Sequence, residues 1–224
     1  MPHDTQPLAR PAERVILLTG FDPFGGDTLN PSWLIAQALH GQRIAGHTVV
    51  AAQLPTVFGQ SLQRLAALVQ AQQPVMTVCL GQAGGRGALS MERIGININD
   101  ARIPDNTGMQ PIDTPVVPEG PAAYFASLPI KAMLRAVQRA GVPCEVSQTA
   151  GTFVCNHVLY GLMHLLAQGA GPAGARGGFV HVPWVSGQST PHLPLRDMVR
   201  GIHAALWAAV LAQQDIALQA GATH

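Results

Sequence analysis

Charged residues are scarce in this sequence of 224 residues: Asp, Glu, Lys and Arg make up 11% of it, against roughly a quarter in an ordinary soluble domain. Neither sign is in excess, because 13 basic and 12 acidic residues leave a formal net charge of +1. Long basic runs are missing too, which argues against a nucleic-acid partner bound by neutralising its phosphates. The low charge, beside 47% hydrophobic residues, suggests that other subunits cover part of the surface and thus predicts a homo-oligomer.

Long apolar runs are also absent. The N-terminal segment MPHDTQPLARPAER carries charges and prolines where a secretion signal needs an apolar stretch. The apolar run at 204–212 stops at about half the length of a membrane span. The few cysteines, Cys79, Cys144 and Cys155, are an odd number and have neither zinc-ribbon nor redox spacing. We therefore expect a cytoplasmic protein with reduced thiols and no membrane partner.

What the sequence does contain is an alternation of strand-like and helix-like segments. Short apolar runs predict strands over residues 14–19, 47–54, 75–80, 94–99, 145–148 and 178–182. Apolar residues at helical spacing predict helices over residues 33–39, 59–71, 130–140, 153–168 and 195–218. This order predicts an α/β fold in three layers, a mainly parallel twisted sheet covered by helices on both faces, within one domain.

Polar and glycine-rich segments follow the predicted strands, at the edge where parallel sheets form their active sites. GFDPFGG (20–26) follows the first strand, GQAGGRG (81–87) follows the third, and His181 lies near the end of the last. The segment at 100–121 is rich in Pro, Gly, Asp and Asn. It is too long for a plain connection, so we expect it to be a functional or interface loop.

Cys155 is a candidate nucleophile because it lies in the first turn of the helix predicted over 153–168. The partial positive charge of a helix N-terminus eases ionisation of a thiol, although a lone cysteine is more often a buried structural residue. Such a thiol needs a base, and His181 can approach it from a separate strand. A carboxylate should then orient the imidazole. Glu92, just past the glycine-rich loop, is the best placed, although it could equally be a surface residue.

Other chemistries find less support in the sequence. His157 and His164 share the helix of Cys155, but their spacing turns them away from it. No HExxH motif or His-Cys cluster is present, so we expect no metal site. The glycine-rich loop lacks the lysine of a P-loop and does not match GxGxxG, which argues against phosphate binding.

Taken together, these segments resemble the pyrrolidone-carboxylate peptidases, also called pyroglutamyl peptidase I, a family of cysteine peptidases. The resemblance runs in unbroken order from about residue 14 to about residue 205. Its segments are GFDPFGGDTLNPSW (20–33), LPTVF (54–58), GQAGGR (81–86), ERIGININDARIPDN (92–106), QPID (110–113), GPAAYFASLPIK (120–131), AGTFVCNHVLYGLMH (150–164) and GGFVHVPW (177–184).

The resemblance implies an α/β sandwich, often tetrameric, that removes an N-terminal pyroglutamyl residue from peptides by acyl transfer, without a metal or organic cofactor. It puts the Glu, Cys and His of the family's triad on Glu92, Cys155 and His181. It also implies that Phe21 and Phe24 clasp the lactam ring of the substrate.

Three further residues are candidates for the substrate site. Phe153, two residues before Cys155, can add to the apolar wall. Backbone groups near Gln82 can meet the lactam, because glycines let the chain approach a ligand closely. The side chain of Arg93 or of Gln82 can support backbone N–H groups that hold the oxyanion.

The sequence departs from the family in two places. It has Ser90-Met91 where the family commonly has Thr-Pro, so a backbone angle that proline would fix is free. Residues 1–13 precede the usual start, and we expect them to be a flexible extension of the domain at 14–224. Two rival functions stay open: an inactive relative that only binds pyroglutamyl peptides, and, with less support, a nucleoside-phosphorylase-like enzyme.

Overall fold

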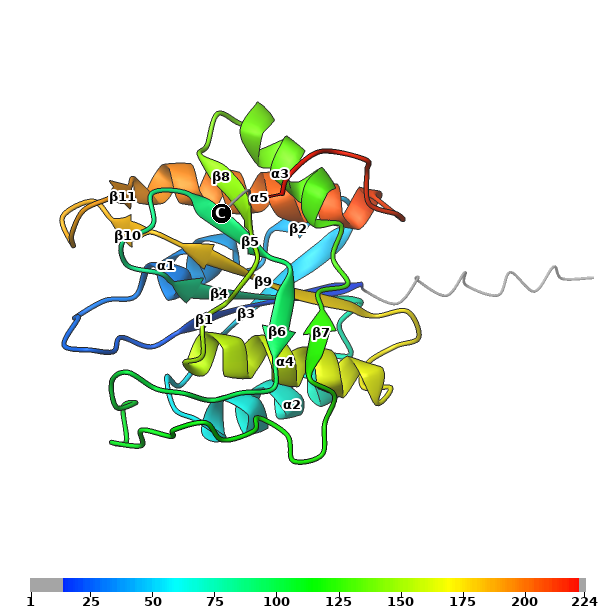
Figure 1. Ribbon diagram of the computed structural model, residues 1–224. Helices are drawn as coiled ribbons and strands as arrows, with labels where there is room; N and C mark the ends of the chain where they lie inside the picture. The colour runs from blue at the N-terminus through cyan, green and yellow to red at the C-terminus, as the bar shows by residue number, and fades with distance from the viewer. Residues whose placement is uncertain (1–13, 222–224) are drawn as a thin grey trace, which may run out of the picture.

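The computed structural model describes residues 14–221, and its centre is a sheet of seven strands (Figure 1). The predicted extension over residues 1–13 lies outside the described residues. The strand order is β2 (Arg43–Ile44), β3 (His47–Leu54), β1 (Val15–Phe21), β4 (Met76–Gln82), β9 (Arg176–Val182), β5 (Leu89–Glu92) and β8 (Cys144–Ser147). Neighbouring strands are parallel except in the pairs β2–β3 and β5–β9. The mainly parallel sheet is therefore confirmed.

Helices cover both faces of this sheet. One face carries α1 (Pro31–Leu39), α3 (Ile130–Arg139) and α5 (Leu195–Leu211), and the other carries α2 (Gln60–Gln72) and α4 (Val154–Ala167). In Figure 1, α3 and α5 lie above the sheet, and α2 and α4 lie below it. Two small strand pairs complete the fold: β6 (Ile94–Ile96) with β7 (Ala123–Phe125), and β10 (Trp184–Val185) with β11 (His192–Leu193). The predicted three-layer sandwich is confirmed, whereas the single-domain boundary at 14–224 stays a prediction.

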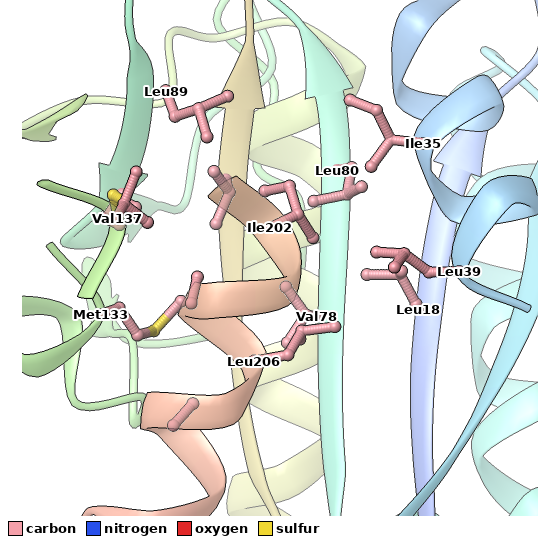
Figure 2. Close-up of a cluster of buried hydrophobic side chains, with 14 of the residues drawn as sticks. Leu18, Ile35, Leu39, Val78, Leu80, Leu89, Met133, Val137, Ile202 and Leu206 are labelled. Carbon is pink, nitrogen blue, oxygen red and sulfur yellow. The ribbon is translucent and has the colours of Figure 1, made fainter. Parts of the chain in front are cut away.

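The core has two layers because alternate residues of a strand point to opposite faces of the sheet. On β1, Ile16 and Leu18 pack toward α1, α3 and α5, and Leu17 packs toward α2 and α4. Figure 2 shows the first layer, in which labelled side chains of the sheet meet Ile35 and Leu39 of α1, Met133 and Val137 of α3, and Ile202 and Leu206 of α5. Burial of each such side chain contributes about 1.5–3 kcal/mol. These two layers hold the sheet in place under the site.

The predicted helix over 195–218 is wrong at its C-terminal end, because α5 ends at Leu211. Beyond it, Asp215 accepts hydrogen bonds from the backbone N–H groups of Lys131 and Ala132, at 3.0 and 2.9 Å. A carboxylate is favourable there because the first N–H groups of a helix lack partners within the helix. The contact with α3 thus draws the chain out of the helical path.

The strand predicted over 94–99 is also too long, since β6 ends at Ile96. The sequence reading missed β5 altogether. This strand is short and fully buried. It lies between β9, to which it is antiparallel, and β8, to which it is parallel. The segment at 100–121 is largely irregular, and its carboxylate Asp105 accepts hydrogen bonds from the backbone of Phe58, Thr107 and Met109, whereas its role as a functional or interface loop stays a prediction.

Candidate active site

The site begins where β4 and β9 end. These strands are parallel neighbours, and Gly81 of β4 is in register with His181 of β9. Two residues earlier, Cys79 and Phe179 form another such pair, and both pack in the layer of α4. Because side chains alternate along a strand, His181 faces the same layer as they do. The fold thus turns the imidazole toward the N-terminal end of α4.

His181 and Glu92 are brought together by the antiparallel pair β5–β9. Ser90 lies opposite His181, and Glu92 follows two residues later on the same face, in a diagonal position that side chains can bridge. His181 Nδ1 donates a hydrogen bond to Glu92 Oε1 at 2.7 Å. This bond leaves Nε2 of the neutral ring as a proton acceptor. The arrangement is that of a base held by a carboxylate.

Glu92 is completely buried. The alternative from the sequence, that Glu92 is a surface residue, is therefore wrong. A buried carboxylate needs a partner of opposite charge, and Arg86 provides it: Nη1 donates to the same Oε1 atom at 2.8 Å. Arg86 belongs to the glycine-rich loop and also reaches the backbone oxygen of Thr149 through Nη2, at 3.3 Å. The loop therefore supplies a cation to the carboxylate.

Cys155 lies in the first turn of α4, as the sequence predicted. The N-cap residue Phe153 forms no side-chain capping bond, so no side chain at that position competes for the first N–H groups of the helix. The sulfur lies against β4: a β-carbon built on Gly81 would be only 2.7 Å from Cys155 Sγ. Since Gly81 is the register partner of His181, the thiol and the imidazole occupy neighbouring positions over the sheet.

Burial of the Cys155 sulfur acts against the ionisation that a helix N-terminus favours. The pKa of the Cys155 thiol is raised to about 12, mainly by burial and then by the nearby carboxylate of Glu92, with a smaller contribution from the thiol of Cys79, while Arg86 lowers it. Loss of water around the sulfur thus outweighs the favourable charge of Arg86. The thiol is protonated at neutral pH, so its proton has to be removed as the reaction proceeds.

The other histidines of α4 are engaged elsewhere. His157 Nδ1 donates to Asn99 Oδ1 at 2.9 Å, and its Nε2 accepts from the backbone N–H of Gly59 at 3.0 Å. Burial lowers the pKa of His157 to about 4. His164 Nδ1 is 3.0 Å from the hydroxyl of Tyr124. Both rings therefore tie α4 to neighbouring segments.

A cavity of about 570 Å³ opens among the loops at this edge of the sheet. Its lining combines apolar side chains, glycines and a few polar groups: Phe24, Gly25, Asp27, Gln82, Gly84, Gly85, Arg102, Ile103, Trp184, Gln188 and Ser189. The ring of Phe24 lies 6.1 Å from that of Phe153, and Phe153 makes an edge contact of 5.4 Å with Phe58. An aromatic wall thus runs from the cavity to the N-cap of α4.

Polar side chains connect the loops around this cavity. Gln82 Nε2 and Gln188 Nε2 both donate to Asp27 Oδ2 at 2.8 Å, and Gln188 Nε2 also donates to Gln82 Oε1 at 2.9 Å. The Gln82 side chain is therefore engaged with neighbouring loops.

Three of the predicted substrate-site residues, Phe21, Arg93 and Phe153, are outside the cavity lining, although Phe153 contacts the lining residue Phe24. Phe21 is 2% exposed, packs in the core with its ring 6.4 Å from that of Phe179, and so lies behind the site. Arg93 Nε donates to Gln148 Oε1 at 2.8 Å, and the residue borders a different groove with Lys131.

The sequence reading missed Arg86 as the partner of Glu92, and it also missed Arg102 and Trp184 in the cavity lining. Arg86 did carry a signal, because it is the charged residue of a loop otherwise made of small residues and one glutamine. Trp184 and Gly84 carried none. A β-carbon on Gly84 would be 2.4 Å from the Trp184 ring, a contact that only the fold reveals.

Residues 14–221 contain no group of three or more His, Cys, Asp or Glu side chains arranged to hold a metal ion. None of the helices in this part of the chain has the length and apolar character needed to cross a membrane.

Comparisons with known proteins agree on one family. The family model described as pyroglutamyl peptidase matches residues 14–212. The pyrrolidone-carboxylate peptidase of Cupriavidus pinatubonensis is 51% identical over 216 residues, which cover 94% of this chain and 100% of that protein. The pyrrolidone-carboxylate peptidase of Streptomyces coelicolor is 53% identical over 215 residues, covering 93% and 99%.

Solved structures are similar over the same length. The crystal structure of pyroglutamyl peptidase I from Bacillus amyloliquefaciens has a TM-score of 0.89 and 43% sequence identity, and the match covers 92% of this chain and 100% of that one. The pyrrolidone carboxyl peptidase from Thermococcus litoralis has a TM-score of 0.88 at 31% identity, with coverage of 92% and 99%.

Proposed function

This chain belongs to the pyroglutamyl peptidase family of cysteine-type peptidases, and we propose that Cys155, His181 and Glu92 carry out its reaction. The protein removes an N-terminal pyroglutamyl residue from peptides. The observation that carries the assignment of residues is the chain of contacts over one face of the sheet. Glu92 holds His181 at 2.7 Å, and the Cys155 sulfur lies against Gly81, the register partner of His181.

Acylation starts with the neutral thiol. His181 Nε2 accepts the thiol proton as Cys155 Sγ attacks the carbonyl carbon that follows the lactam ring. The raised pKa of the buried Cys155 thiol favours coupling of proton transfer to the attack. The carbonyl oxygen takes the negative charge, and we assign its stabilisation to the N–H groups at the start of α4, which have no partners within the helix.

Collapse of this intermediate breaks the peptide C–N bond. The imidazolium of His181 gives its proton to the departing amine, which leaves a thioester on Cys155. Water then attacks the thioester while His181 accepts its proton, pyroglutamate leaves, and the proton returns to the thiol. Glu92 holds the ring in one tautomer and stabilises its charged form at each step.

The cavity suits an uncharged, flat lactam. Phe24 and Phe153 offer an apolar wall that leads to Cys155, whereas Phe21 packs in the core against Phe179. The backbone at Gln82 can exchange hydrogen bonds with the ring N–H and C=O. Arg93 as an oxyanion donor would have to leave Gln148, so we favour the helix N–H groups for that role.

We also propose that copies of the chain associate and that the enzyme works in the cytoplasm. The charge content of 11% supports association. So do large apolar side chains at the surface, since Trp207 is 46% exposed and Leu211 is 61% exposed on α5. Three unpaired cysteines, Cys79, Cys144 and Cys155, fit a reducing compartment.

Turnover of a chromogenic pyroglutamyl amide tests the assignment of the nucleophile. Cys155→Ala should lose at least about four orders of magnitude in kcat/KM, because members of a triad act as a unit. Cys144→Ala is the matched control and should keep wild-type turnover, since its sulfur lies against the backbone oxygen of Leu134, away from the triad. Normal turnover by Cys155→Ala would contradict the proposal. A prolyl amide, which has a charged amine and no ring carbonyl, should not be cleaved.

A further inference from the structure

Arg86 has no part in the proton transfers proposed above, yet it touches the triad. It is the charged residue of the glycine-rich loop 81–87, its side chain is 29% exposed, and Nη1 lies 2.8 Å from Glu92 Oε1. The carboxylate it meets is completely buried.

The two hydrogen bonds to Glu92 fall on one oxygen atom. Oε1 accepts from both Arg86 and His181, whereas Oε2 has no hydrogen-bond partner among residues 14–221. A buried carboxylate with half of its acceptor capacity unused has few means of balancing its negative charge. Two cations are within reach: the permanent one of Arg86 and the one that His181 would acquire by binding a proton.

We propose that Arg86 is a positioning residue that balances the charge of Glu92, so that His181 stays neutral between turnovers and is ready to accept the thiol proton. This inference rests on the proposed triad. It assigns Arg86 to charge balance, while proton transfer stays with His181.

The reasoning is a matter of net charge in a dry site. With Arg86 in place, the pair of Arg86 and Glu92 is neutral, and a proton on His181 would add an uncompensated charge. Without Arg86, the same carboxylate is balanced best by an imidazolium, which persists to higher pH and cannot act as a base. Arg86 also lowers the pKa of the Cys155 thiol. Loss of the Arg86 cation would therefore raise the pKa of that thiol, and the reaction would again need a higher pH.

Other titratable groups around this pair come from three elements. Cys155 on α4 and Cys79 on β4 are both neutral thiols at pH 7, since burial raises the pKa of each to about 12. Glu145 on β8 accepts a hydrogen bond from Ser90 at 2.8 Å and is exposed to solvent, which screens its charge. Among the groups named here, Arg86 is the cation in contact with Glu92.

A structural role has to be separated from this one. Arg86 Nη2 donates to the backbone oxygen of Thr149, and residue 149 lies in the segment that leads into α4 and Cys155. Removal of Arg86 could therefore lower activity simply by loosening that segment. Such a loss would be the same at every pH, whereas loss of charge balance would move the pH profile.

The test is the pH dependence of kcat/KM for a pyroglutamyl amide with Arg86→Gln and Arg86→Lys. For Arg86→Gln, we expect the acid limb of the profile to move up by about one pH unit or more, which gives roughly a tenfold loss on that limb. Arg86→Lys keeps the cation and should restore most of the shift. Arg64→Gln, which removes an exposed arginine of α2, should keep the wild-type profile.

A profile of Arg86→Gln that overlays the wild-type profile after scaling would overturn the proposal. If Arg86→Gln does not fold, Arg86→Met is the second neutral variant, and the same shift is required of it. If both neutral variants fail to fold while Arg86→Lys has the wild-type profile, Arg86 is a structural residue and the proposal is wrong.

A second measurement needs no substrate. Mass spectrometry follows the rate at which iodoacetamide modifies Cys155 as a function of pH. The increase of this rate with pH should begin at a higher pH in Arg86→Gln than in the wild type. Cys155→Ala is assayed in parallel. If that variant turns over substrate, the triad and the role of Arg86 both fail. If it is inactive and Arg86→Gln keeps the wild-type pH profile, the role of Arg86 fails alone.

Discussion

Gly81 leaves the space that the sulfur of Cys155 occupies. A β-carbon at position 81 would lie 2.7 Å from Cys155 Sγ and 2.6 Å from Cζ of Phe179, both closer than real contacts allow. The backbone of Gly81 itself is in an ordinary strand, so the requirement for glycine here is one of space. The nucleophile and the sheet are therefore fitted to each other through a missing side chain.

Gly81→Ala should push Cys155 out of position. We expect a loss of about 10²-fold in kcat/KM, because displacement of a reacting atom by a fraction of an ångström is costly. Overpacking should also lower the free energy of unfolding by about 1–3 kcal/mol. Gly87→Ala in the same loop is the control, since its β-carbon would make only an ordinary 3.5 Å contact with Pro191. Equal activity of the two variants would show that the sulfur does not depend on this space.

His181→Ala and Glu92→Gln should differ in severity. Loss of His181 removes the base and should cost nearly as much as loss of Cys155. Glu92→Gln removes orientation and charge but leaves both the nucleophile and the base, so it should cost less. Steady-state kcat/KM of the two variants is the measurement, with Glu145→Gln as a carboxylate control expected to be active. A larger loss for Glu92→Gln than for His181→Ala would contradict the assigned roles.

Phe24→Ala should weaken substrate binding without disabling the thiol. The lost apolar wall contributes on the order of 1–3 kcal/mol, so KM should rise about tenfold or more. Reaction of Cys155 with iodoacetamide does not use that wall, and its rate should change little. Phe125→Ala, which removes a ring that is 67% exposed, should leave both quantities unchanged. Equal losses in turnover and alkylation would mean that Phe24 supports the fold around Cys155.

His157 should make stability depend on pH. Burial lowers its pKa from 6.5 to about 4, so between these values the unfolded chain binds a proton that the folded chain does not. Stability should therefore fall as pH drops from about 6.5 to about 4, by up to about 3 kcal/mol from this group. Its ring joins Asn99 to Gly59, the N-cap of α2, and would lose its acceptor site on protonation.

His157→Gln should be less stable than the wild type at pH 7.5 but should lose less stability on acidification. Urea unfolding at pH 7.5, 6 and 5 measures this difference, and His203→Gln on α5 serves as a control with the wild-type slope. If the free energy of unfolding of His157→Gln depends on pH as in the wild type, His157 is not the cause of this pH dependence.

Local sequence patterns were enough to predict most of the fold and the elements that carry the site. The strand at residues 47–54 was predicted to the residue, although its alternation of buried and partly buried residues shifts phase at Val50 and Ala51. The end of α5 was not predictable, since the sequence stays compatible with a helix beyond Leu211 and the helix stops where Asp215 binds the start of α3. The strand β5 was missed because its polar residues are buried by contacts with β8 and β9.

The site shows the same division. Cys155 and His181 could be ranked from their places at the ends of predicted elements, whereas Glu92 became the orienting carboxylate through the resemblance. Arg86 follows Gly81 by five residues, yet its contact with Glu92 depends on how the loop folds back over β5. A contact between two loops that are adjacent only in the folded chain leaves little trace in the spacing of residues along the sequence. Such contacts became visible in the structure.

Affinity labelling with a pyroglutamyl chloromethyl ketone identifies the nucleophile by its own reaction, because the reagent joins lactam recognition to alkylation of the nucleophile. We expect one label per chain, located by peptide mass spectrometry on Cys155, with protection by free pyroglutamate and loss of peptidase activity in step with labelling. Cys79 and Cys144 should stay unmodified. Labelling of another residue in step with loss of activity, with Cys155 left unmodified, would contradict the assignment of Cys155 as the nucleophile.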